Sequence, residues 1–252
     1  MFKFLKDTHK LSWCAILSAL AFILSLVEIP TPFQAYLSID FSEIPILIGA
    51  YSLGSGGLII IVILRSVLRF ALKGTLIIGE VAAVLASIIC GLSFIYLRHF
   101  KKGPKSLLAV YLPVYGLSIA LMITVFILRP SWWLYAFFLI LGILIFILII
   151  NLIPKFGQSE IKDFLVESVI VIYIVTVLMT ILNFIFITPS NFLGKLATYQ
   201  TVLDMGVSLD DYLITYILPL LPFNILKYTI IFIVFYLIRR ILTFFDKKKE
   251  AS

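Results

Sequence analysis

The stretch LLPFNILK, Leu220 to Lys227, lies inside the last long apolar run of the chain, Tyr212 to Ile241. A run of this length spans a lipid bilayer as one helix, and counting from its ends places Lys227 near the middle of the membrane. An ammonium at that depth costs several kcal/mol even with local water defects, so it rarely lacks a function. The sequence therefore predicts a helical membrane protein with a polar group inside its bundle.

Two neighbours of Lys227 are also unusual in a membrane helix. Asn224 precedes it by three residues and so lies on nearly the same helical face. Pro222 has no backbone donor and frees a carbonyl in the same neighbourhood. Together these residues favour one wall of a polar pocket, with Lys227 as a donor to a ligand. The alternative is a lysine that snorkels to the interface or is the counter-ion of a buried acid.

The composition extends this interpretation to the whole chain. Of the 252 residues, 62% are hydrophobic and only 13% are charged, which is more apolar surface than a soluble domain can bury. The apolar runs are continuous rather than alternating, which excludes an outer-membrane barrel. We expect one all-α transmembrane domain over residues 1–252, with eight segments: Leu11–Ile29, Glu43–Leu53, Leu58–Leu72, Leu76–Tyr96, Leu107–Leu128, Trp132–Ile153, Phe164–Ile187 and Tyr212–Ile241.

The charged residues between these segments sort to alternating sides. One side carries basic clusters at both ends of the chain and after the fourth and sixth segments, among them Lys3, Lys10, Arg98, Lys101, Lys155 and Arg239. The other side carries mainly acids: Asp40, Asp204, Asp210 and Asp211. The positive-inside rule then places both termini in the cytoplasm. The net charge of +7 is a topology signal, and nucleic acid is not expected as a partner.

The sequence contains no residue pattern typical of a metal site, a catalytic nucleophile or a nucleotide-binding loop. The histidines, His9 and His99, lie in cytoplasmic loops, and the cysteines, Cys14 and Cys90, lie within membrane segments, so neither a metal site nor a disulfide framework is predicted. The glycine-rich turn at 53–57, LGSGG, is not followed by the Lys-Ser or Lys-Thr of a phosphate loop. We expect no enzyme, no cofactor and no ATPase in this chain.

Three cations share one face of the third segment: Arg65, Arg69 and Lys73 follow at intervals of four. Within a bilayer this face must look onto protein or water. Glu80 opens the fourth segment at the outer level, so we expect an ion pair from Glu80 to Arg69 or Lys73. The same face could instead bind an anionic or carbonyl-rich ligand.

Uncharged polar residues form a stripe on the seventh segment, namely Tyr173, Thr176, Thr180 and Asn183. Asn183 and Asn224 lie at the same outer depth as Asp40 in the first outer loop. Dispersed polar groups at one depth are what an externally loaded binding pocket needs. In that loop, Ser42 is expected to cap the next helix.

Four stretches carry a family resemblance. They are AILSALAF from Ala15, the segment Ile29 to Gly54 with its DFSEIP, GEVAA from Gly79 to Ala83, and LNF at Leu182–Phe184 taken together with LPFNILK. They resemble the substrate-binding S components of energy-coupling factor vitamin transporters, and among these the riboflavin-specific type. The resemblance implies a six-helix core, about 11–97 and 164–241, in a prokaryotic plasma membrane. The hairpin over about 107–153 has no counterpart in the family and is interpreted as an insertion.

The resemblance also implies functions for particular residues. Asn183, Asn224 and Lys227 correspond to the residues that hold the ring and ribityl chain of riboflavin, the transported ligand. Asp40, Glu80 and Thr180 complete the expected substrate-binding set. The small-residue pair Ala15 and Ala19 corresponds to the surface that docks onto a transmembrane coupling subunit, which works with two cytoplasmic ATPases; packing within the bundle is the alternative for this pair.

Two alternatives remain open at this point. Flavin-type members tend to carry Asn where this chain has Ala83, which favours another small vitamin or a precursor. From a different class, a membrane-embedded enzyme acting on a lipid or isoprenoid could use the face of Arg65, Arg69 and Lys73 as an anion clamp. Such enzymes need acidic metal-binding clusters, and the only adjacent acidic pair, Asp210 and Asp211, lies in an outer loop.

Overall fold

The structure is a computed structural model, and it describes residues 7–31, 37–74, 77–99, 160–217 and 219–250. The long helices of this part are α2 (Thr8–Leu26), α3 (Glu43–Lys73), α4 (Ile77–His99), α7 (Glu160–Leu182) and α11 (Leu220–Glu250). By length and composition, four helical stretches of the described residues can cross a membrane: Thr8–Leu26, Glu43–Lys73, Ile77–Arg98 and Glu167–Leu193. The predicted segments Leu107–Leu128 and Trp132–Ile153 lie outside the described residues.

Helix α3 folds back on itself at Gly54. This residue has φ 72° and ψ −162°, a conformation that only glycine adopts readily. A Cβ on Gly49 would lie 2.2 Å from Cδ1 of Ile61, whereas twelve residues of straight helix would separate them by about 18 Å. The turn predicted at LGSGG therefore exists, and it divides α3 into a first arm (43–53) and a second arm (55–73).

The first arm of α3 is too short to cross a bilayer upright, as the sequence predicts. Its eleven residues extend about 16 Å against a hydrocarbon core of about 30 Å. The arm is buried over most of residues 43–50, with Ile46 and Leu47 fully inaccessible. Its N-terminal end consequently lies inside the bundle, where irregular backbone is tolerated because protein surrounds it.

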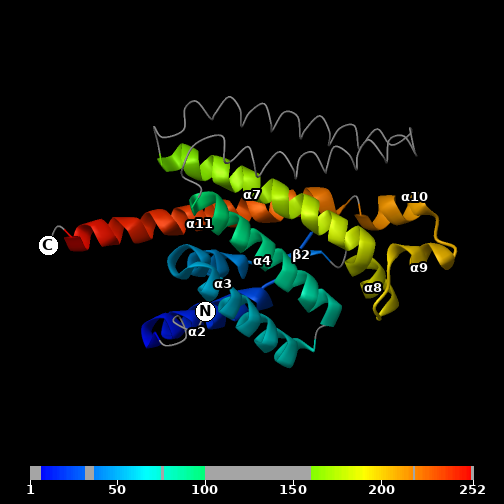
Figure 1. The fold of residues 1–252 in the computed structure, drawn as a ribbon, viewed down its shortest axis with the longest axis horizontal. Coiled ribbons are helices and arrows are strands. Elements are labelled where there is room, and N and C mark those ends of the chain that lie inside the picture. Colours follow the sequence, from blue (N-terminus) through cyan, green and yellow to red (C-terminus); the bar gives the residue numbers. More distant parts are fainter. Residues whose placement is uncertain (1–6, 32–36, 75–76, 100–159, 218, 251–252) are drawn as a thin grey trace.

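A short hairpin leads into this arm. Strands β1 (Ile29–Pro30) and β2 (Ser38–Ile39) pair antiparallel, with Ile29 opposite Ile39. The backbone N–H and the hydroxyl of Thr31 both donate to the carbonyl of Leu37, at 3.2 and 2.8 Å. This connection leads the chain from α2 through β2 to the first arm (Figure 1), and Asp40 directly follows β2.

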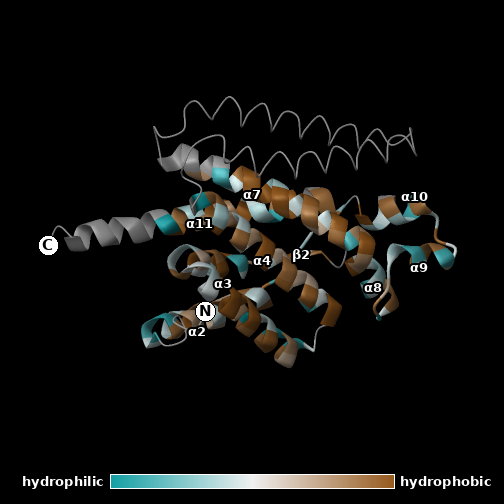
Figure 2. Cartoon of the chain, in the orientation of Figure 1, coloured by the Kyte–Doolittle hydropathy of each residue, from teal (hydrophilic) through white to brown (hydrophobic). Residues whose placement is uncertain are grey.

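Helices α7 and α11 run along the long axis of the molecule and pack against α3 and α4 (Figure 1). The shared core contains an aromatic group of Phe94, Phe164, Phe232 and Phe235, whose ring centroids lie 5.5 to 6.2 Å apart. Brown, hydrophobic residues follow these helices along much of their length in Figure 2. The core thus holds α7 and α11 as a pair beside the first arm.

The segment between α7 and α11 is divided into short helical pieces. They are the π-helix η2 (Asn183–Ile187), α8 (Thr188–Leu193), α9 (Tyr199–Asp204), α10 (Leu209–Tyr212) and the π-helix η3 (Leu213–Ile217). The Tyr212 hydroxyl donates to the carbonyl of Phe184 at 2.9 Å and so ties α10 to η2.

The expectation of one helix over Tyr212 to Ile241 is wrong in its first part. Helix α11 begins at Leu220, directly after Pro219. Proline has no N–H to continue the hydrogen bonds of a preceding helix, and its fixed φ suits the start of a new one. Lys227 is therefore about two turns from the start of α11, and the mid-membrane position inferred for it depended on a longer helix.

Candidate functional site

The centre of the candidate site is an ion pair between α11 and the β2–α3 connection. Lys227 Nζ lies 3.2 Å from Asp40 Oδ2, and the two side chains are 14% and 9% exposed. The sequence interpretation preferred Lys227 as a ligand donor over a counter-ion. In this structure it is the counter-ion of a buried acid, because the hairpin carries Asp40 to the depth of Lys227.

Asp40 is held from its other side by Ser42. The Ser42 backbone N–H donates to Asp40 Oδ1 at 3.0 Å, and the Ser42 hydroxyl donates to the same oxygen. Burial alone would raise the pKa of Asp40, but the charge of Lys227, the two Ser42 hydrogen bonds and the charge of Arg65 hold it well below its usual range. The expected cap is wrong: the Ser42 side chain bonds to Asp40 and caps no helix.

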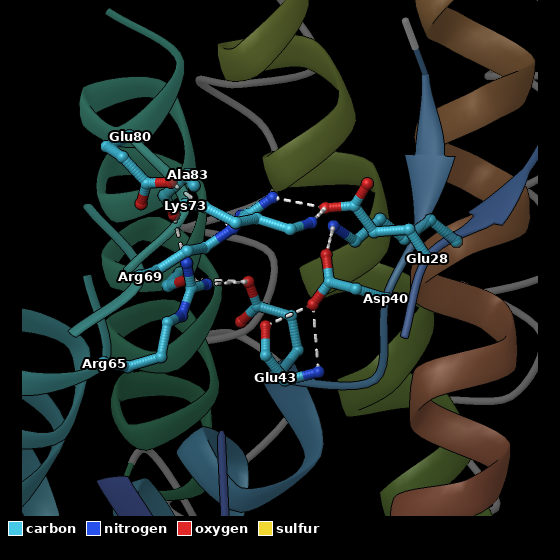
Figure 3. Close-up of polar contacts among 11 residues, drawn as sticks. Glu28, Asp40, Glu43, Arg65, Arg69, Lys73, Glu80 and Ala83 are labelled. Atoms are coloured by element: carbon cyan, nitrogen blue, oxygen red, sulfur yellow. Dashed lines mark hydrogen bonds and ion pairs between the residues drawn. The ribbon is translucent and has the colours of Figure 1, made fainter. Parts of the chain in front are cut away.

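A second buried pair lies next to the first. Arg65, on the second arm of α3, places Nη2 3.8 Å from Glu43 Oε1, at the start of the first arm. Ser87 on α4 connects them, because Arg65 Nη2 donates to its hydroxyl at 3.3 Å and this hydroxyl donates to Glu43 at 2.6 Å. Figure 3 shows this pair beside Asp40.

A third group of charges lies at the outer end of α3 and α4. Glu28, which follows α2, accepts hydrogen bonds from Arg69 at 2.7 Å and from Lys73 at 2.6 Å. Arg69 Nε also lies 3.4 Å from Glu80 Oε1, so the predicted Arg69–Glu80 pair is confirmed. Burial alone would raise the pKa of Glu28, but its hydrogen bonds and the charges of Lys73 and Arg69 lower it.

The three groups form one cluster that is balanced in charge. Its carboxylates are Glu28, Asp40, Glu43 and Glu80, and its cations are Arg65, Arg69, Lys73 and Lys227. Figure 3 labels the four carboxylates together with Arg65, Arg69 and Lys73. A cluster without net charge suits a neutral, polar ligand better than an anion or a cation, because an ionic ligand would leave one charge uncompensated.

The amide of Asn224 lies one helical turn before Lys227 and is 7% exposed. Within the described residues it has no hydrogen-bond partner. A side-chain amide can donate and accept hydrogen bonds at once. It is therefore available to a ligand in contact with α11.

Asn183 and Thr180, also predicted for the site, are hydrogen-bonded to their own helix. Asn183 Nδ2 donates to the carbonyl of Met179 at 2.7 Å, and its Oδ1 accepts from the Thr188 hydroxyl at 3.3 Å. The Thr180 hydroxyl donates to the carbonyl of Thr176 at 2.7 Å. Neither side chain is hydrogen-bonded to Asp40, Lys227 or Asn224. Asn183 does begin the π-helix η2, and such turns are frequent at functional sites.

Sequence reasoning missed Glu43 and Ser87. Glu43 lies in the DFSEIP stretch, and a carboxylate opening an apolar helix was a signal that Arg65 had a partner there. Ser87 carried no such signal, because a serine within a membrane helix usually bonds to its own backbone. Its hydroxyl does lie 2.9 Å from the carbonyl of Ala83.

The face of α2 with the expected docking pair is exposed in the part of the chain that the structure describes. Ala15 and Ala19 are exposed, whereas Leu17 and Ala21 on the other face are buried. Large apolar side chains accompany the pair on the exposed side: Trp13, Ile16, Leu20 and Ile23.

Comparisons with known proteins agree with the resemblance in part. The family described as "ECF transporter, substrate-specific component" matches residues 9–141. The "Riboflavin transporter RibU" of Staphylococcus aureus (strain TCH60) is 28% identical over 109 residues, which are 41% of this chain and 56% of that protein. The chain thus spans about half the length of this relative.

A solved structure, described as "Structure and mechanism of the S component of a bacterial ECF transporter", resembles the chain with a TM-score of 0.53. The likeness covers 95% of this chain and 98% of that one at 21% sequence identity. At this identity the likeness concerns the fold alone.

Proposed function

The chain belongs to the substrate-specific components of energy-coupling factor (ECF) transporters, and we propose that it binds riboflavin or a close flavin relative from the outside. It is a multi-pass membrane protein of transport and not an enzyme, so the alternative of a lipid- or isoprenoid-processing enzyme does not hold. Counted with the two arms of α3 apart, the helices α2, α3, α4, α7 and α11 support the six-segment core.

One observation carries the choice of ligand. Asn224, which has no hydrogen-bond partner among the described residues, lies one helical turn before Lys227, and Lys227 and Asp40 belong to a cluster whose formal charges sum to zero. A flat, neutral ring with carbonyls and ring nitrogens requires amide and ammonium hydrogen bonds without a net charge to neutralise. Binding would exchange the Asp40–Lys227 contact for contacts to the ligand.

The similarity to a riboflavin transporter supports the same ligand. Asn183, Asn224 and Lys227 lie beyond the residues 9–141 that match the family, so their proposed function depends on the resemblance of the LNF and LPFNILK stretches. Asp40 and Glu80 lie within that range. With Thr180 on α7 they complete the proposed substrate-binding set.

Members of this family associate with the ECF energizing module. For this chain we propose a transmembrane coupling subunit with two cytoplasmic ATPases as that module, in a prokaryotic plasma membrane. The exposed face of α2 with Ala15 and Ala19 is the proposed docking surface, because small side chains allow close approach of another helix.

The test is equilibrium binding to the purified, full-length protein. Riboflavin is titrated and the quenching of its fluorescence is measured; flavin absorbance of the protein as purified is a second readout. We expect Asn224→Ala and Lys227→Ala each to weaken binding by about 10-fold or more, because each removes a buried hydrogen bond to the ligand. Asn191→Ala is the matched control, since Asn191 is exposed on α8. Unchanged affinity in both site variants contradicts the proposed site, and absent binding to the unmodified protein contradicts riboflavin as substrate.

A second candidate is another small vitamin or a precursor. Ala83 favours it, because this half-buried residue lies on α4 between Glu80 and Ser87 and brings no amide to the cluster. Mass spectrometry of the small molecule that co-purifies with the protein distinguishes the two candidates.

A further inference from the structure

The Arg65–Glu43 pair is buried more deeply than any other ion pair of the described residues, yet its hydrogen bonds are incomplete. The two side chains are 1% and 2% exposed. Their closest approach is 3.8 Å, beyond hydrogen-bond range, and only one nitrogen of Arg65 is involved. Arginine–carboxylate pairs are frequently bidentate, with two parallel hydrogen bonds of about 2.7–2.9 Å.

Three atoms of this pair remain without a hydrogen-bond partner in the described part of the chain. They are Nε and Nη1 of Arg65 and Oε2 of Glu43. Leaving such groups unpaired costs about 1–3 kcal/mol each, and more for charged groups. Two donor atoms and one acceptor atom, each on a fully buried side chain, are therefore available for further hydrogen bonds.

The pair adjoins the proposed ligand site. Glu43 is three residues from Asp40, and Ser42 between them holds the Asp40 carboxylate. On the opposite side, Ser87 contacts both partners and also the carbonyl of Ala83. Figure 3 shows Arg65 and Glu43 directly below the Lys73 and Arg69 side chains, with Asp40 at their side.

We propose that Arg65 and Glu43 form a subsite for a cyclic amide edge of the ligand, that is, a ring carbonyl next to a ring N–H. Arg65 donates from Nε or Nη1 to the carbonyl oxygen, and Glu43 Oε2 accepts from the ring N–H. The proposal rests on the proposed function and adds two residues and a chemical class to it.

The chemistry of the two side chains selects this class of group. Guanidinium is a donor only and an ionised carboxylate is an acceptor only, so the two together complement a group that presents an acceptor beside a donor. The pyrimidine-dione ring of a flavin has such an edge, with an N–H at ring position N3 between two carbonyls. Asn224 and Lys227 are then left for the other ring nitrogens and the ribityl hydroxyls.

The experiment compares riboflavin with its N3-methyl derivative, both titrated against the full-length protein by fluorescence quenching. For the unmodified protein we expect methylation to raise the Kd about 10- to 100-fold, because the N–H that Glu43 accepts is gone and the carboxylate is left unpaired. In Glu43→Ala, riboflavin is expected to bind about 10-fold more weakly, with the two ligands now equal within about twofold. Arg65→Lys keeps the charge but loses the planar donor fork, and should weaken both ligands.

The control variant is Asp204→Ala, which removes an exposed carboxylate on α9, outside the charge cluster. It should keep the full discrimination between riboflavin and the methylated ligand. Equal binding of both ligands by the unmodified protein overturns the subsite but leaves the proposed function intact, and this result does not depend on the folding of any variant. Full discrimination retained in Glu43→Ala also overturns it. No binding of either ligand to the unmodified protein contradicts the proposed function itself.

Discussion

The Lys227–Asp40 pair allows a quantitative prediction by a double-mutant cycle. At an effective dielectric constant of about 20, unit charges 3.2 Å apart attract by about 5 kcal/mol before desolvation is subtracted. Removing one partner of a buried pair usually costs about 3–5 kcal/mol, because the other charge remains uncompensated. Asp40 keeps its two hydrogen bonds from Ser42, so we expect Lys227→Met to lower the free energy of unfolding by about 3 kcal/mol, the lower end of that range.

The double variant Asp40→Asn with Lys227→Met should recover most of this loss. Neither group is then charged, and the amide introduced at position 40 still accepts from Ser42. The assay is thermal unfolding of the purified protein without ligand. For a chain of this size about 3 kcal/mol corresponds to a Tm lower by roughly 6–12 °C, and the double variant should return to within about 1 kcal/mol of the unmodified protein.

The refuting result is additivity. If the two single substitutions sum to the effect of the double one within about 0.5 kcal/mol, the side chains do not interact in the folded protein. Lys227 would then be free for a ligand from the start, as the sequence alone suggested.

Three further predictions concern pH, packing and docking. Asp40 has a lowered pKa in the folded state, so its stabilising contribution is present above the unfolded pKa and is lost on acidification. When the pH is lowered from about 5 to about 2.5, the Tm should therefore fall less steeply in Asp40→Asn than in the unmodified protein. Gly91→Ala should lower the free energy of unfolding by about 1–3 kcal/mol, because its Cβ would lie 2.4 Å from Leu58 Cδ1, while Gly79→Ala, with nothing within 4 Å, should not destabilise. Ala15→Trp should reduce co-purification with the coupling subunit at least several-fold without changing riboflavin affinity, since the residue is exposed and far from the site; equal co-purification would contradict docking on this face.

The sequence predicts the helices of this protein well where hydrophobic length decides. The turn at LGSGG and the short arm before it were predicted, because eleven apolar residues between a polar loop and three glycines indicate a short helix that ends in a turn. The start of α11 at Leu220 was not predicted, because a hydropathy average does not distinguish Pro219 from the apolar residues around it. The helix cannot continue through Pro219 because proline lacks a backbone N–H, and hydropathy scales do not include this property.

For the candidate site, the sequence predicts which residues are polar at one depth but not how they pair. It predicted that Glu80 pairs with Arg69 or Lys73, since these residues lie near the facing ends of consecutive helices, and the structure shows the Arg69 pair. It did not pair Lys227 with Asp40, because 187 residues separate them and only the hairpin of β1 and β2 brings them together. Pairing over such distances depends on the packing of the whole bundle.

The first arm of α3 also has an electrostatic consequence. Its N-terminal end carries roughly half a positive charge from the aligned peptide dipoles, and Asp40 and Glu43 lie at that end. The two carboxylates are therefore partly compensated by the backbone itself. The helix dipole therefore reduces the energetic cost of drawing Lys227 from Asp40 toward a ligand, although it does not replace the charge of the ammonium.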